Sequence, residues 1–166
     1  MAVTEDLYAP TEDNIKLLCD NGLLNGKKIA VPDVGAATHA IVVAKSNNGI
    51  SLQVVDLSSN GVSIEHQENI DESRGHFSIT FDNVNSDSIG DESSGWEMYE
   101  SIINQAAVLF SYEQIGGSQA ALDMAINYAK ERYAFGRPIG SYQAIKHKLA
   151  DCLLYTSPSP RDKHRS

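Results

Sequence analysis

One apolar stripe between residues 93 and 131 constrains the fold of this chain more than any other feature. Apolar or small residues recur at every seventh position, namely Ile103, Phe110, Gly117 and Met124, with Ala106, Ala107, Ala120, Ala121 and Tyr128 beside them. This spacing predicts one very long amphipathic helix over about residues 93–131. An isolated helix of that length cannot bury its own stripe, so we expect partner helices within a bundle or from another subunit.

Two adjacent glycines, Gly116 and Gly117, interrupt the middle of this predicted helix. Each glycine destabilises a helix by about 1 kcal/mol relative to alanine. We therefore expect another backbone to pack closely against the helix at this point.

The segment from residue 28 to about 84 shows the two-residue periodicity of strands and is rich in Val, Ile and Thr. One face of a predicted strand carries Phe77, Ile79 and Phe81. Asn48–Gly49 predicts a tight hairpin turn, and "NGKK" at residues 25–28 is a second candidate turn. We predict an α+β fold, with a small antiparallel β-barrel or sandwich domain followed by the long helices of an incomplete helical bundle.

Composition and charge restrict the partners of the chain. Apolar residues make up 42% and charged residues 21%, which is typical of soluble globular proteins. The formal net charge is -9, and this excludes nucleic acid as a general partner because phosphate binding requires a broad basic face. Residues 131–152 form a basic segment within this acidic chain, so this segment is still a candidate site for an anionic ligand.

Cysteine usage and hydropathy indicate a reducing, aqueous compartment. Cys19 and Cys152 fit neither a metal-ligand spacing nor a disulfide framework, and the acidic start "MAVTED" lacks the basic and apolar regions of a signal peptide. No apolar run approaches the roughly 20 residues of a membrane span. We predict a cytoplasmic protein with no membrane contact. The histidines lack the spacing of metal ligands, so no metal site is predicted.

The predicted helix is followed by "ERYAFGRPIGSYQ", residues 131–143, which combines basic, aromatic and turn residues. Gly136 and Pro138 end the helix, and Ser141 is placed to cap the next one. One interpretation of the basic residues is structural. In it, Lys130 and Arg132 complement the helix dipole and Arg137 caps free carbonyls in the turn.

The other interpretation is a pyrophosphate site at the same turn. Arg132 and Arg137 offer forked donors, and the amides around residues 142–144 would be free at the start of the second helix. Phe135 would then serve as an apolar or stacking wall, and Gln143 as an amide hydrogen-bonder.

Residues 116–151, "GGSQAALDMAINYAKERYAFGRPIGSYQAIKHKLAD", resemble the first long helix and connecting turn of the C-terminal domain of acyl-CoA dehydrogenases. The family pattern there is small residues, then ALD, then YAxxRxxFGxPIxxxQxIxxKLAD. The preceding "LLNGKKIAVPDVGAATHAIVVAK" and "GVSIEHQENIDESRGHFSITFDNV" resemble the middle β-domain of the same family, and "AVTE" at residues 2–5 resembles the "xxTE" that opens that domain.

This resemblance covers about residues 2–152 and implies an internal fragment with three segments. Residues 1–90 correspond to the middle β-domain, and residues 91–152 to the first helices of a truncated C-terminal helical domain. We interpret residues 153–166, "LLYTSPSPRDKHRS", as a non-native tail translated from adaptor or vector sequence.

The resemblance implies FAD as the cofactor and carries four contacts to it onto this chain. Arg132 matches the arginine that reaches the FAD pyrophosphate of the neighbouring subunit, and Phe135 and Gln143 match positions that also touch that cofactor. Thr4 matches the threonine that contacts the flavin ring of its own subunit. The implied partners are an acyl-CoA substrate, a homo- or hetero-oligomer that shares FAD across subunits, and electron-transfer flavoprotein as the acceptor.

The activity that the resemblance implies is α,β-desaturation of an acyl-CoA thioester by an FAD-dependent oxidoreductase. The family's glutamate base usually lies downstream of the turn, and in some members it lies on the long helix near Ala106, where alanine has no basic group. We therefore nominate no catalytic residue and expect this fragment to be inactive.

Three positions depart from the family pattern. Ala30 and Pro32 of "AVP" stand where many members have a flavin-packing tryptophan and a threonine, and Ala107 stands where many have an acyl-CoA-binding arginine. The loop "DLYAPTED" also replaces the usual glycine-rich segment. With these departures, the chain resembles divergent members of the family that form one half of a hetero-oligomer. They support the alternative that the parent is a non-catalytic partner subunit of a hetero-oligomeric acyl-CoA dehydrogenase.

Overall fold

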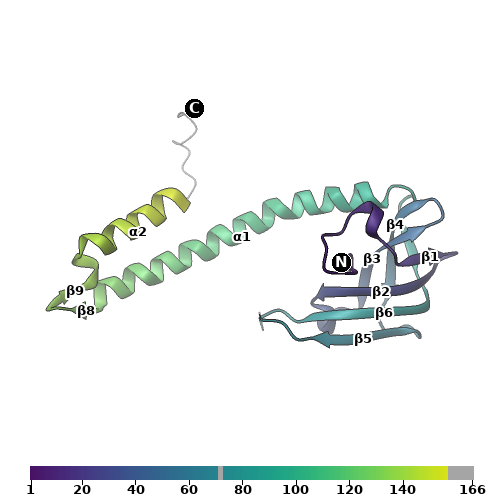
Figure 1. Ribbon diagram of the computed structural model, residues 1–166, viewed down its shortest axis with the longest axis horizontal. Helices are drawn as coiled ribbons and strands as arrows, with labels where there is room; N and C mark the ends of the chain where they lie inside the picture. The colour runs from purple at the N-terminus through teal and green to yellow at the C-terminus, as the bar shows by residue number, and fades with distance from the viewer. Residues whose placement is uncertain (71–72, 157–166) are drawn as a thin grey trace, which may run out of the picture. The chain divides into compact units, whose positions relative to one another are not determined.

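A seven-stranded sheet forms the first part of the computed structural model, which describes residues 1–70 and 73–156 (Figure 1). Its strand order is β5-β6-β2-β1-β3-β4-β7. The strands are β1 (Leu18–Asp20), β2 (Leu23–Pro32), β3 (His39–Ser46), β4 (Gly49–Asp56), β5 (Val62–Gln67), β6 (His76–Asn85) and β7 (Asp87–Ile89). Neighbouring strands pair antiparallel, except that β1 meets β3 in parallel.

The predicted α+β class is confirmed, with an open sheet in place of a closed barrel. Strands β5 and β7 lie at opposite edges of the sheet in the described residues. The alternation of "HFSITF" places its aromatic and aliphatic residues on one face, as predicted from the sequence. That face supplies Phe77, Ile79 and Phe81 to a core shared by β1, β2, β3, β4 and β6.

The adjacent strands β3 and β4 are buried on both faces, which explains why they are rich in Val and Ile. Val42 and Val55 belong to the core that the sheet shares with β6. Val43 and Leu52 point to a second core, which is packed by Val3, Ile15, Trp96, Met98 and Tyr99. The start of the long helix therefore covers one face of the sheet.

The N-terminal segment, residues 2–5, continues the sheet where the short strand β1 ends. The N–H of Ala2 donates to the carbonyl of Ile41 at 2.7 Å, and the N–H of Val43 donates to the carbonyl of Ala2 at 3.0 Å. On the other side, the N–H of Ile29 donates to the carbonyl of Thr4 at 2.8 Å. The segment thus bonds to both β2 and β3.

The turns differ in part from those predicted. Asn21–Gly22, with φ angles of 51° and 79°, connects β1 to β2. Residues 25–28 lie inside β2, so the turn predicted there is wrong, and Gly26 occupies an irregularity in the β2–β6 register. The hairpin between β3 and β4 is confirmed, but its loop is Asn47–Asn48, one residue earlier than predicted.

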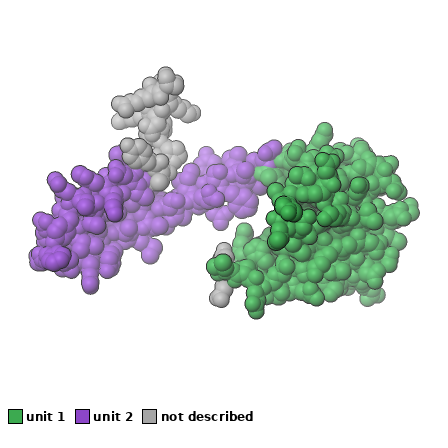
Figure 2. Space-filling view, in the orientation of Figure 1, with its two compact units in different colours: residues 1–103 green, residues 104–166 purple. Residues whose placement is uncertain are grey.

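Helix α1 (Gly95–Glu131) is a single helix of 37 residues, as the apolar stripe predicted. The chain divides into two compact units, residues 1–103 and 104–166 (Figure 2). In the second unit, the described part of α1 buries Leu122 and Ala129 but exposes Val108, Leu109, Phe110, Tyr112, Met124 and Tyr128. A methyl group added at Gly116 or Gly117 would meet nothing within 4 Å, so the described part of this chain does not supply the close backbone neighbour expected there.

A short hairpin and a second helix follow α1. Strands β8 (Tyr133–Ala134) and β9 (Arg137–Pro138) pair with each other, and the 3₁₀ turn η3 (Ile139–Ser141) leads into α2 (Gln143–Thr156). Gly140 approaches the backbone of Ala129, since a Cβ on Gly140 would lie 2.9 Å from the carbonyl oxygen of Ala129. Helix α2 therefore begins beside the last turns of α1, as Figure 1 shows.

The start and end of α2 differ from the sequence-based expectation. Ser141 does not cap the helix, because its Oγ is buried and has no hydrogen-bond partner in the described structure. The helix begins after Tyr142, whose carbonyl accepts the N–H groups of Ile145 and Lys146. The helix continues to Thr156, past the predicted boundary at residue 152, and the remainder of the predicted tail, residues 157–166, lies outside the described residues. None of the helices described is long and apolar enough to cross a membrane.

Candidate functional site

Arg132 lies at the point where α1 ends and the chain turns toward α2. Its N–H donates to the carbonyl of Tyr128, and its carbonyl accepts the N–H of Ile139 at 2.8 Å, which brings Arg132 next to the turn before α2. The side chain is exposed. In the described structure the Arg132 guanidinium has no ion pair or hydrogen bond. This fork is therefore available to an external anion.

Arg137, the second cation of the turn, is held by the fold itself. Its guanidinium lies over the ring of Tyr142, 4.0 Å from the centroid. The hydroxyl of Tyr142 donates to the carbonyl of Ala134 at 2.8 Å, so Tyr142 provides the carbonyl cap that we expected from Arg137. Such a cation–π contact contributes about 0.5–1 kcal/mol at an exposed site. The two arginines thus differ: Arg137 stabilises the hairpin, and Arg132 is free.

The N-terminus of α2 presents free backbone donors close to this turn. Within the described residues, the N–H groups of Gln143 and Ala144 have no hydrogen-bond acceptor, whereas the N–H of Tyr142 donates to the carbonyl of Ile139. The Gln143 side chain is exposed. Free amides at a helix N-terminus favour an anion, because the helix dipole adds a partial positive charge there.

Phe135 occupies the tip of the hairpin in an unusual conformation. Its φ angle is 51°, followed by 78° at Gly136, so both loop residues are left-handed as in a type I′ turn. A bulky residue is rare in this region of backbone space. The side chain is also 97% exposed and contributes no packing to the described fold. Residues held in sparsely populated backbone conformations cluster at active sites and ligand-binding segments.

Thr4, the fourth predicted cofactor contact, lies in the first unit, whereas Arg132, Phe135 and Gln143 lie in the second. Thr4 is half-buried, and its carbonyl is fixed by the N–H of Ile29. The three residues of the second unit share one turn of the chain, so the structure brings these three together locally.

A buried ion pair next to Thr4 was missed in the sequence. Lys28 is fully buried, and its Nζ lies 2.6 Å from Oε1 of Glu5 and 2.9 Å from the carbonyl of Val3. Burial lowers the pKa of Lys28, and the hydrogen bond and charge of Glu5 oppose that shift. Lys28 has the same parity as the buried Leu24 in β2, so the strand pattern placed a lysine on the inward face.

The positions that depart from the family pattern lie on the surface. Ala30 and Pro32 are exposed in β2, and Ala107 is exposed on α1. Ala30 has a φ angle of 51° where the β2–β6 register shifts, and its N–H donates to Oε1 of Gln67 at 2.8 Å. The bulge places Ala30 on the surface without leaving its amide unpaired.

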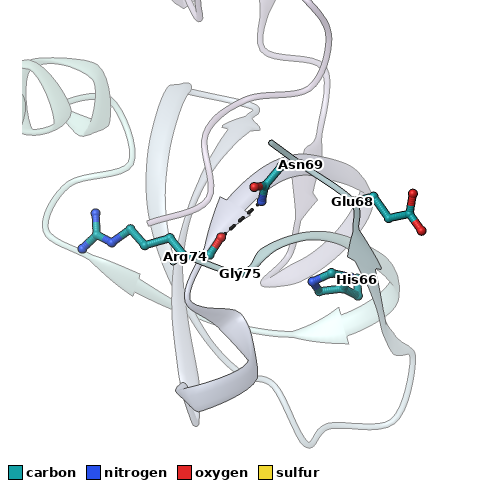
Figure 3. Close-up of a pocket in the computed structure, with 5 residues that line it drawn as sticks. All are labelled: His66, Glu68, Asn69, Arg74 and Gly75. Carbon is teal, nitrogen blue, oxygen red and sulfur yellow. Dashed lines mark hydrogen bonds between the residues drawn. The ribbon is translucent and has the colours of Figure 1, made fainter. Parts of the chain in front are cut away.

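The hollow shown in Figure 3 lies between the end of β5 and the start of β6. It has a volume of about 390 Å³ and is lined by His66, Glu68, Asn69, Arg74 and Gly75. Asn69 donates to the carbonyl of Arg74 at 3.2 Å, and the Arg74 side chain extends away from His66 and pairs with Asp33. None of the four predicted cofactor contacts lines this hollow.

Comparisons with known proteins identify the family. Residues 93–157 match the family model "Acyl-CoA dehydrogenase, C-terminal domain". Acyl-CoA dehydrogenase IpdE2 of Mycobacterium tuberculosis is 52% identical over 53 residues, which are 32% of this chain and 17% of that protein. The chain belongs to the acyl-CoA dehydrogenase family. The caffeyl-CoA reductase-Etf complex subunit CarC of Acetobacterium woodii is 33% identical over 168 residues, covering 89% of this chain and 44% of CarC.

A solved structure has the same fold over most of this chain. The FAD complex of PigA matches with a TM-score of 0.79 and 25% identity, covering 93% of this chain and 44% of PigA. The chain thus spans less than half of each of these relatives. Across the described residues, no three His, Cys, Asp or Glu side chains are grouped as metal ligands would be.

Proposed function

We propose that this chain forms the flavin-clamping part of an FAD-dependent acyl-CoA dehydrogenase, which desaturates an acyl-CoA thioester between its α and β carbons. The observation that carries this proposal is the turn between α1 and α2. Arg132 has a free, exposed guanidinium, and its backbone lies next to the turn that leads into a helix whose first amides are unpaired; Phe135 is exposed at the adjacent hairpin tip. These groups match the chemistry of a pyrophosphate with an attached aromatic ring system.

Each of these residues has a distinct role in the proposal. Arg132 donates two hydrogen bonds from its guanidinium to the pyrophosphate, and Gln143 adds one from its side-chain amide. The free backbone amides at the start of α2 add hydrogen bonds and the partial positive charge of the helix N-terminus. Phe135 offers an apolar face to the cofactor, and Thr4 holds the flavin ring. When bound, FAD would supply the acceptor for the hydride that leaves the β carbon, and the protein would orient the two reactants and exclude water.

The partners follow from the same clamp. Arg132, Phe135 and Gln143 would reach the FAD of a neighbouring subunit, and Thr4 that of its own, so the functional unit is an oligomer. The exposed stripe of α1 supports this, because large apolar patches mark interfaces. CarC belongs by its name to a complex with Etf, which supports electron-transfer flavoprotein as the acceptor. Among the described residues, Cys19 and Cys152 form no disulfide, which supports the cytoplasm as the compartment.

The present chain alone is expected to be inactive in dehydrogenation. No residue in it matches the family's catalytic base, and Ala106 stands at the alternative position on α1. The chain also holds only part of the proposed flavin site, since the clamp of one subunit serves the cofactor of another. A non-catalytic partner subunit is the second candidate, and the exposed Ala30, Pro32 and Ala107 favour it because they lack the groups that other members use.

The test of the clamp is Arg132→Lys in the full-length protein assembled with its partners. A capping cation needs only its charge, contributes about 0.3–1 kcal/mol and tolerates lysine. A pyrophosphate ligand needs the planar fork, which lysine reproduces poorly. We expect Arg132→Lys to leave thermal unfolding of the apoprotein unchanged and to speed FAD dissociation, measured by flavin fluorescence. Gln143→Ala should have the same effect with a smaller magnitude.

Lys130→Ala is the matched control, because Lys130 is the basic residue in the last turn of the same helix. It should alter stability slightly and leave FAD dissociation unchanged. Equal FAD retention in Arg132→Lys and the parent would refute the clamp and leave the dipole interpretation in place. An assay with an acyl-CoA and an artificial electron acceptor then separates the enzyme from the non-catalytic subunit.

A further inference from the structure

The buried Lys28 is the starting point for an inference about how Thr4 is held. Among the described residues, Lys28 is the one charged residue that is fully buried, with no exposed surface. A charge in that position requires compensation, and Lys28 receives it from the Glu5 carboxylate at 2.6 Å and the carbonyl of Val3 at 2.9 Å. Both partners lie directly beside Thr4 in the chain.

Glu5 is itself fixed by the backbone. Its Oε2 accepts the N–H of Lys16 at 2.8 Å, and its Oε1 accepts the N–H of Leu17 at 3.0 Å. Because the carboxylate also bonds to Lys28, it connects the N-terminal segment to β2 and to the chain just before β1. Glu5 therefore cannot move without breaking these three hydrogen bonds.

Thr4 is thus bracketed on both sides. Val3 is held through its carbonyl by Lys28, Glu5 is held through its carboxylate by the same ammonium, and the Thr4 carbonyl accepts the N–H of Ile29. Two apolar side chains of similar volume would fill this space without the desolvation cost of an ion pair. Unlike apolar contacts, the hydrogen bonds of the ion pair are directional, so they fix the position of the backbone of residues 3–5.

We propose that Lys28 is a positioning residue that holds Thr4 in place for the flavin. This inference rests on the proposed function, since it assigns Lys28 a role through Thr4. Lys28 itself makes no contact with the cofactor in this proposal, because its ammonium is enclosed by Val3 and Glu5. The effect of losing Lys28 should therefore depend on whether Thr4 carries its hydroxyl.

The experiment is a double-mutant cycle in the full-length flavoprotein, with Lys28→Met, Thr4→Val and the combination. We expect each single variant to weaken FAD binding about tenfold, and the combination to weaken it no further, because both remove the same contact. The visible absorption spectrum of bound flavin should shift in the same direction in all three. Lys27→Met is the matched control, since Lys27 is a half-exposed neighbour in the same strand, and it should retain the parent's affinity and spectrum.

Two further measurements keep the outcome decisive. If Lys28→Met does not fold, Glu5→Gln keeps the side-chain shape, weakens the bond to Lys28 and replaces it in the cycle. Amide hydrogen exchange at Ile29 reports the order of Thr4 in the absence of flavin, and it should accelerate in Lys28→Met but not in Lys27→Met. An unchanged Ile29 amide, or additive effects of Lys28→Met and Thr4→Val on FAD affinity, would overturn the positioning role. If Thr4→Val alone leaves affinity and spectrum unchanged while Ile29 exchange accelerates, the flavin contact assigned to Thr4 fails and Lys28 merely orders the segment.

Discussion

Replacing Phe135 by asparagine should stabilise the hairpin between α1 and α2 while weakening the cofactor site. Phe135 and Gly136 have φ angles of 51° and 78°, and Asn-Gly is the pair that such a two-residue loop prefers. A left-handed conformation costs an ordinary residue about 1–2 kcal/mol, and asparagine tolerates it better. The Phe135 side chain is 97% exposed, so its removal forfeits no packing within the chain. The net change should be a gain of about 1 kcal/mol.

The assay for this gain is hydrogen exchange at the amides of the β8–β9 hairpin in the present chain. A stabilisation of about 1 kcal/mol corresponds to roughly fivefold slower exchange through local opening. In the full-length protein, the same variant should bind FAD less tightly. An aromatic contact contributes about 0.5–1.5 kcal/mol beyond its buried area, so the dissociation constant should rise about tenfold or less.

Phe135→Ala separates the two effects, because it removes the ring but keeps an ordinary residue at a left-handed position. It should lose FAD affinity as Phe135→Asn does and gain no protection in the hairpin. The reasoning would be refuted by exchange in Phe135→Asn that is as fast as in the parent, since the strain would then be absent. FAD affinity equal to the parent's in both variants would refute the cofactor contact.

Three more outcomes are expected. Gly116→Ala should stabilise α1 by about 1 kcal/mol in thermal unfolding of this chain, because its added Cβ meets open space. Gly61→Ala should destabilise the chain, because Gly61 has a φ angle of 91° and an added Cβ would collide with the carbonyl of Asp82. A loss of stability in Gly116→Ala would contradict this. Burial raises the pKa of the Cys19 thiol, against a hydrogen bond with Ser86, so mass spectrometry after alkylation at about pH 8 should find Cys152 modified well before Cys19. Hydrogen bonds from Ser58 lower the pKa of Asp56 below its ordinary 3.8, so the contribution of Asp56 to stability is present above pH 3.8 and is lost as the pH falls through its folded pKa. In Asp56→Asn, the free energy of unfolding should therefore fall less steeply as the pH is lowered through this range. An unchanged pH dependence would contradict the assignment.

Regular elements with a strong period were predictable from the sequence, because each of their residues repeats the same signal. The seven-residue spacing placed α1 to within two residues of its observed start, and the alternation around Ile79 placed β6 with the correct inward face. These patterns follow from burial along one face of an element, which depends on sequence spacing alone.

Features that depend on three-dimensional contacts were not predictable in the same way. Two Asn-Gly pairs lie four residues apart, and the chain turns at Asn21–Gly22. Gly26 instead lies in a strand, where an added Cβ would lie 3.1 Å from Leu17. Ser141 has the residue type of a helix cap, yet its hydroxyl is buried one residue too early to serve the helix. The sequence also gave no sign that Lys28 would pair with Glu5, because the partners are 23 positions apart and meet only in the folded sheet.

The N-terminal segment also has a consequence for the order in which the chain folds. Residues 2–5 lie 25 or more positions before their hydrogen-bond partners on β2 and β3. Contacts of such long sequence separation form slowly because a large loop must close before they contribute. We expect residues 2–5 to remain unpaired until β2 and β3 have been synthesised and have joined the sheet. The segment then docks in a late step of folding. A ribosome-bound chain that ends before β3 would therefore leave residues 2–5 open to proteolysis.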